Sequence, residues 1–127
     1  MMRALLLVGM GGALGSMARY LCQRWMAESY PHAFPFGTFA VNLSGCLLIG
    51  LFWSLTLKGG DQPDTWKLFL MTGVCGGFTT FSAFSLESIG LIRENRIGFF
   101  LLYVSGSVTL GILATFAGMK LGRLFTP

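Results

Sequence analysis

The sequence predicts an all-α integral membrane protein with four transmembrane helices. Of its 127 residues, 54% are hydrophobic and only 11% are charged, against roughly 25% charged in an ordinary soluble domain. Four long stretches carry no formal charge, and they lie at 4–18, 31–57, 68–86 and 97–119. A spanning helix needs about 20 apolar residues, and a soluble chain of this size cannot hide so much apolar surface. We expect one domain over residues 1–127.

The first two spans are expected at 4–25 and 36–57. The first uncharged stretch is short, and it reaches spanning length only by continuing through Arg19. Arg3 followed by an apolar run also resembles a signal peptide. The run continues beyond its small residues, however, so we expect the segment to be retained. The link between the two spans contains His32, the only histidine.

The third and fourth spans are expected at 66–91 and 97–121. A turn is predicted at 58–64, where the sequence reads KGGDQPD, and a very tight link at 93–96. The middle of the third span reads GVCGGFTTFSAFS at 73–85. Paired glycines and paired threonines are poor helix formers, so this pattern predicts a break. Carbonyl groups freed at such a break can hold a small cation.

Charge patterning gives little orientation. Four spans place both termini on one side, and that side holds five basic residues: Arg3, Lys58, Lys67, Lys120 and Arg123. The other side holds four: Arg19, Arg24, Arg93 and Arg96. So weak a bias allows insertion both ways, and two opposite copies could then pair. Small residues at helix-packing spacing, such as Gly11/Gly15, Gly73/Gly77 and Gly118/Gly122, predict close packing.

Motifs for an enzyme or a nucleic-acid-binding protein are missing from the sequence. It contains no Ser/His/Asp set, HExxH or Walker loop, and the glycines at 9–15 lie in a hydrophobic helix. The basic residues are scattered singly, which is typical of interfacial anchors. Cys22, Cys46 and Cys75 fall in three different spans without metal-binding spacing, so we interpret them as apolar packing residues.

Polar residues within the spans are the candidate functional residues, because each is costly in lipid. Arg19 follows the glycine face of the first span, and it is either functional or a helix-end anchor. Glu87 lies toward the end of the third span, where it could belong to a polar pathway. Thr38 and Asn42 share a face of the second span, as do Tyr103 and Ser107 in the fourth. Neutral donors along a stripe suit an anion, although they also suit hydrogen bonding between helices.

Phenylalanines recur every three residues in the third span, at Phe78, Phe81 and Phe84. The edge of an aromatic ring is weakly positive, so such a stripe can face an anion. A stripe that faces lipid or the protein core is the other interpretation.

Taken together, three pieces of sequence resemble the Fluc (CrcB) family of bacterial fluoride channels. They are GGALGSMARY at 11–20, GTFAVN at 37–42 and GVCGGFTTFSAFS at 73–85, in family order. The resemblance extends over essentially the whole chain. It implies an antiparallel, dual-topology homodimer in the bacterial inner membrane, with two fluoride pores and one structural sodium ion at the dimer centre.

The resemblance also implies roles for individual residues. The backbone carbonyls of Gly76 and Thr79 would bind the sodium ion. The fluoride pore would be lined by Phe81, Phe84, Asn42, Thr38, Ser82, Tyr103, Ser107 and Glu87, with Arg19 near a vestibule. Many family members have a hydroxyl residue where this chain has Ala83, so one polar position of the pore is missing.

The mechanism implied by the resemblance is passive. Hydrogen fluoride crosses a membrane as a neutral acid and dissociates in a near-neutral cell, which traps the anion. A selective pore lets fluoride leave, and the membrane potential contributes about 2.3 kcal/mol per charge per 100 mV.

Other membrane proteins fit the sequence less well. A small multidrug antiporter has a similar size, but it needs an acid in the first span, and none precedes Glu28. A membrane enzyme such as a lipid kinase needs clustered acids for magnesium, and the five acids here form no such cluster. A purely structural assembly protein has no reason to carry the glycine-threonine-phenylalanine segment.

Overall fold

The computed structural model describes residues 1–56 and 63–125, and over this part of the chain the protein is helical and holds no strand. Four helices within it are long and apolar enough to cross a membrane: Met2–Ser29, Phe36–Thr56, Lys67–Arg93 and Ile97–Leu124. The first, second and fourth are α1 (Met2–Ser29), α2 (Phe36–Thr56) and α6 (Ile97–Leu124). The third is preceded by α3 (Pro63–Trp66) and consists of η1 (Lys67–Cys75), α4 (Gly76–Phe78) and α5 (Phe81–Arg93). The four predicted spans are confirmed.

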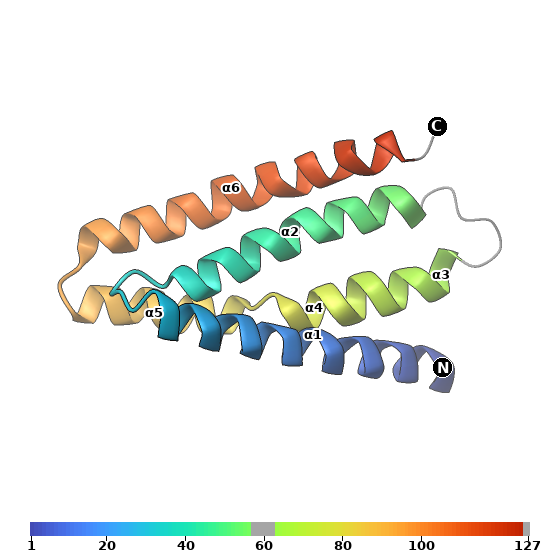
Figure 1. Cartoon of the computed structure of the whole chain (residues 1–127), viewed down its shortest axis with the longest axis horizontal. Coiled ribbons are helices and arrows are strands. Elements are labelled where there is room, and N and C mark those ends of the chain that lie inside the picture. The colour runs from blue at the N-terminus through green and yellow to red at the C-terminus, as the bar shows by residue number, and fades with distance from the viewer. Residues whose placement is uncertain (57–62, 126–127) are drawn as a thin grey trace.

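The predicted boundaries differ from the observed ones mainly at the helix ends. α1 continues to Ser29 and α6 to Leu124, so both helices are longer than expected. Most of the turn predicted at 58–64 lies outside the described residues. The start of α1 and the end of α6 lie at the same end of the bundle in Figure 1, as an even number of spans requires.

Glycines let two pairs of helices approach closely. In the α2–α6 pair, a Cβ atom on Gly50 would overlap the carbonyl oxygen of Thr115, and one on Gly118 would overlap that of Leu47. In lipid, such backbone contact supplies the packing that the hydrophobic effect supplies in water. The same device joins α1 to the third span, where a Cβ atom on Gly15 would overlap the carbonyl oxygen of Val74. The close packing predicted from the glycine pairs is therefore confirmed.

The first half of the third span is irregular, and its second half ends in a tight turn. η1 is a π-helix, a form that is rare and often found at functional sites. α5 ends in a tight turn to α6 at Glu94 and Asn95, as the short link predicted. Asn95 has φ 57°, and the amide of Arg96 donates to the carbonyl of Leu91 at 2.8 Å. Asn tolerates this left-handed conformation better than most residues, so a Schellman-type cap ends α5 without glycine.

An aromatic cluster closes the bundle at the end that holds this turn. Phe34, Leu91 and Tyr103 form its buried centre, and Phe39, Phe84, Phe99 and Phe100 pack around them. Tyr103 is fully buried. By contrast, α1 carries a row of exposed apolar side chains, among them Leu14, Met17 and Leu21, as expected of a helix that faces lipid or another chain.

Candidate functional site

The third span breaks at Thr79 and Thr80. Thr79 has φ −88° and ψ 155°, and Thr80 has φ −146° and ψ 120°, so both residues are extended. Thr80 is the midpoint of the span Lys67–Arg93. The predicted break is confirmed, and it lies where backbone groups most need partners within the protein.

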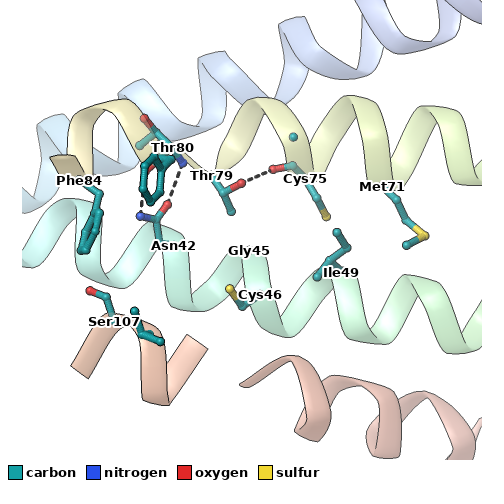
Figure 2. A pocket seen from close by; sticks show the side chains of 13 residues that line it. Asn42, Gly45, Cys46, Ile49, Met71, Cys75, Thr79, Thr80, Phe84 and Ser107 are labelled. Atoms are coloured by element: carbon teal, nitrogen blue, oxygen red, sulfur yellow. Dashed lines mark hydrogen bonds between the residues drawn. The ribbon is translucent and has the colours of Figure 1, made fainter. Parts of the chain in front are cut away.

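Asn42 binds the free backbone amide and carbonyl of Thr80 at the break. Its Oδ1 accepts from the amide of Thr80 at 2.8 Å, and its Nδ2 donates to the carbonyl of Thr80 at 3.0 Å. Figure 2 shows Asn42 pointing from α2 toward the segment between α4 and α5. One turn further along the same face of α2, a Cβ atom on Gly45 would overlap the side chain of Thr79. The carboxamide thus replaces the helical hydrogen bonds that Thr80 lacks.

The carbonyls of Gly76 and Thr79 lose their regular helical donors at the break. The donor for Gly76 would be the amide of Thr80, which binds Asn42 instead. The donor for Thr79 would be the amide of Ala83, which donates to the hydroxyl of Thr80 at 3.1 Å. Both Gly76 and Thr79 line the same cavity. Carbonyl oxygens released in this way are suitable ligands for a hard cation, so the residues fit the sodium site implied by the resemblance.

The start of α5 presents free amide groups, in contrast to the carbonyl groups at the end of α4. The first amides of a helix have no acceptor within it and lie at the positive end of the helix dipole. Thr80 caps one of them, that of Ala83, and its hydroxyl lies 3.3 Å from that of Ser82. The break therefore places carbonyls of the first half-helix close to amides of the second.

A cavity of about 340 Å³ lies beside the break, between α2, the third span and α6. Its lining contains no acidic or basic side chain, and it includes Asn42, Phe81, Phe84 and Ser107. The ring centroids of Phe81 and Phe84 are 5.7 Å apart, and Phe81 is 79% exposed. Among the described residues, Ser107 has a buried hydroxyl oxygen without a hydrogen-bond partner. Four of the expected pore residues are therefore gathered around one neutral cavity.

Three other expected residues form a separate hydrogen-bonded group. Thr38 donates its hydroxyl proton to Glu87 Oε1 at 2.7 Å, and Tyr103 donates to Glu87 Oε2 at 3.2 Å. The Tyr103 ring also packs on Phe84, with centroids 5.0 Å apart. The Thr38–Glu87–Tyr103 group joins α2, α5 and α6 at one level of the bundle.

The sequence analysis missed Gln23, which extends this group to α1. Its Nε2 donates to the hydroxyl oxygen of Thr38 at 2.9 Å. A polar residue four positions after Arg19, one helical turn away on the same face, was the available signal.

A second cavity, of about 550 Å³, borders Thr38 and Glu87 of this hydrogen-bonded group. Gln23, Thr38, Ala83 and Glu87 line it, together with residues of the 30–37 segment such as His32. Glu87 does not line the first cavity, and Phe84 does not line the second. The group thus borders the second cavity, which lies near the 30–37 segment and is called the mouth cavity below, and it contacts the lining of the neutral cavity through Phe84.

Arg19 is not at a helix end, so the anchor interpretation is wrong. It lies ten residues before the end of α1, and its Nε donates to the carbonyl of Gly77 at 3.1 Å. A cation at the carboxyl end of a helix is favoured by the dipole and satisfies a free carbonyl. Arg19 lines neither of the two cavities described above, and its observed contact ties α1 to the break.

Comparison with known proteins agrees with this architecture. The family model for CrcB-like protein, Camphor Resistance (CrcB), matches residues 6–119. A protein of Rhizobium meliloti named fluoride-specific ion channel FluC is 48% identical over 123 residues, covering 96% of this chain and 98% of that protein. Proteins of the same name from Flavobacterium psychrophilum and Caulobacter sp. are 43% identical over 122 residues and 48% identical over 124 residues, with 96% of this chain covered in each case and 98% and 96% of the relative. A match over nearly the full length at this identity shows that the chain belongs to the CrcB-like family.

Proposed function

We propose that this protein is a fluoride channel of the bacterial inner membrane that releases fluoride from the cytoplasm. Its relatives carry the name of a fluoride-specific channel, and the four spans give a multi-pass membrane protein. It is a transport protein and not an enzyme. The observation that carries the proposal is the neutral cavity beside the break, which is lined by Phe81, Phe84 and Ser107, with the Ser107 hydroxyl oxygen buried and unpartnered among the described residues.

The chemistry of this cavity suits a small, strongly hydrated anion. Fluoride loses most of its water in a narrow pore, so the pore must supply hydrogen-bond donors and weakly positive edges in its place. Ser107 offers an uncommitted O–H, and Ser82 lies beside the amides that begin α5. No acid in the lining repels an anion there. Fluoride would pass between the mouth cavity and the neutral cavity. Its path would follow Thr38 and Asn42 of α2 and Tyr103 and Ser107 of α6.

The conducting unit of the proposal is an antiparallel homodimer with two pores. One chain leaves Phe81 largely exposed beside an open cavity, so a second chain is needed to complete the wall. The five-to-four distribution of basic residues is compatible with insertion in both orientations. A partner related by a two-fold axis would bring its own break next to that of the first chain and complete two equivalent pores.

A structural sodium ion belongs to the same proposal. One chain supplies two carbonyl ligands, those of Gly76 and Thr79, and a two-fold partner would supply two more. A bound sodium ion contributes positive charge at the dimer centre and holds the two breaks together. We expect purified dimer to unfold at a lower temperature when sodium is replaced by N-methylglucamine. An unchanged unfolding temperature over all sodium concentrations would exclude this site.

The decisive test is fluoride efflux from liposomes that contain the purified protein, beside liposomes loaded with chloride. Fast, electrogenic loss of fluoride without loss of chloride is the expected result. If fluoride stays inside while the protein is demonstrably folded and dimeric, the proposed function is wrong, and the likeness to the family describes a fold without the activity.

A further inference from the structure

Gln23 is placed against Thr38 by a close approach of two helices. A Cβ atom on Gly37 would lie only 3.5 Å from the Cα atom of Gln23, so the start of α2 packs directly on α1. Gln23 Nε2 then reaches the hydroxyl oxygen of Thr38 at 2.9 Å. Thr38 is buried, and Gln23 lines the mouth cavity next to it.

The hydroxyl group of Thr38 has one proton and can accept hydrogen bonds through its lone pairs. Its proton goes to Glu87 Oε1 at 2.7 Å. The group facing Gln23 is therefore a lone pair, and only the N–H side of the carboxamide can satisfy it. Reversing the carboxamide would place two acceptors against each other, unless Thr38 turned its proton away from Glu87. The donation from Gln23 therefore agrees with the hydrogen bond from Thr38 to Glu87 and holds the Thr38 hydroxyl in that orientation.

We propose that Gln23 is a positioning residue of the permeation pathway, which acts by directing the hydroxyl proton of Thr38 toward Glu87. Directed in this way, Thr38 and Tyr103 both hold the carboxyl group of Glu87 beside the mouth cavity. Without Gln23, the Thr38 hydroxyl is free to turn toward the mouth, and Glu87 loses one of the two groups that fix it. The inference rests on the proposed fluoride conduction.

The test uses full-length protein in liposomes and compares five variants by fluoride efflux: Gln23→Met, Thr38→Val, Thr38→Ser and the two double variants. Gln23→Met keeps the length of the side chain and removes the donor, so we expect efflux to fall about three- to tenfold, the factor that corresponds to one net hydrogen bond. Thr38→Val removes the group through which Gln23 acts, and Gln23→Met should then have no further effect. In Thr38→Ser, which restores the hydroxyl, Gln23→Met should again lower efflux by the same factor. A purely structural contribution of Gln23 to packing would lower efflux equally in all three backgrounds.

The matched control is Cys22→Ala, which alters the neighbouring exposed residue of the same helix and should leave efflux unchanged. If Gln23→Met does not give a folded dimer, Gln23→Asn replaces it, because the shorter side chain keeps the carboxamide but cannot reach Thr38. Wild-type protein that fails to conduct fluoride would overturn the proposed function. Wild-type protein that conducts, with either Gln23 variant at the wild-type rate, would overturn only the role of Gln23.

Discussion

Replacing Asn42 by alanine should release the backbone of the break. The substitution removes both hydrogen bonds to Thr80, at 2.8 and 3.0 Å. An unsatisfied buried donor or acceptor costs about 1–3 kcal/mol, which gives roughly 2–6 kcal/mol for two such groups. Thr80 lines the cavity of about 340 Å³, so water can reach part of the released backbone. We therefore expect a loss of about 2–4 kcal/mol of local stability.

Hydrogen exchange measures this loss directly at the Thr80 amide. A cost of about 2–4 kcal/mol corresponds to exchange that is roughly 30- to 900-fold faster in Asn42→Ala than in the wild type. Asn42→Asp is the matched control, because a carboxylate oxygen can still accept from the Thr80 amide, although the donor to the Thr80 carbonyl is lost. The aspartate variant should keep the amide protected and yet conduct fluoride poorly, since it places a negative charge beside the cavity. Exchange within about threefold of wild type in Asn42→Ala would refute the role of Asn42 as the partner of the break.

Three further substitutions test other parts of the structure. Phe81→Ile removes an aromatic edge from the proposed pathway, so fluoride efflux should fall at least about tenfold. Gel filtration should still show a folded dimer, because the ring is 79% exposed in its own chain. Unchanged efflux would remove Phe81 from the pathway. Gly15→Ala should lower the free energy of unfolding by about 1–3 kcal/mol, because its Cβ atom meets the carbonyl of Val74. Gly9→Ala is the control, since its Cβ atom meets open space and the change should be neutral. Equal stabilities of the two variants would contradict the packing argument. Tyr103→Phe keeps the ring contacts and removes one hydrogen bond to Glu87. The free energy of unfolding should therefore fall by about 0.5–1.5 kcal/mol. A loss several times larger would mean that the carboxyl group of Glu87 finds no other partner.

The parts of the fold that follow from local composition were predictable. Four uncharged stretches and the glycine pairs gave the spans and their close packing, because both depend on residue type and spacing. The break was predictable for the same reason, since GGFTT is unfavourable in a helix wherever it occurs. The end of α1 was not, because the first span was expected to stop at residue 25, whereas the helix continues to Ser29. The partner of Arg19 was not predictable either, because the carbonyl of Gly77 that accepts its hydrogen bond lies far away in the sequence.

The candidate site was predictable as a set of residues but not as a set of partners. Stripe spacing put Thr38 with Asn42 and Tyr103 with Ser107, yet the structure divides each pair between two sites. Thr38 and Tyr103 bind Glu87, whereas Asn42 binds Thr80 and Ser107 lacks a partner. The partner of each polar residue depends on how its helix is rotated and on how deep the residue lies in the bundle. Spacing along one helix gives no information on either. Gln23 was missed because its importance comes entirely from Thr38, on a different helix.

The proposed function requires one broken helix to serve a cation and an anion at once, and its two halves suit this because they end with opposite polarity. The half that ends at Thr79 presents carbonyl oxygens, and the half that begins at Phe81 presents amides at its positive end. An unbroken helix would use all of these groups in its own hydrogen bonds and would offer neither ion anything. The break is stable only because Asn42 and the hydroxyl of Thr80 satisfy the groups that neither ion needs. Under the proposed function, the two extended threonines of the third span, together with Asn42 of α2, would provide both a cation site between two chains and the start of a pathway for fluoride.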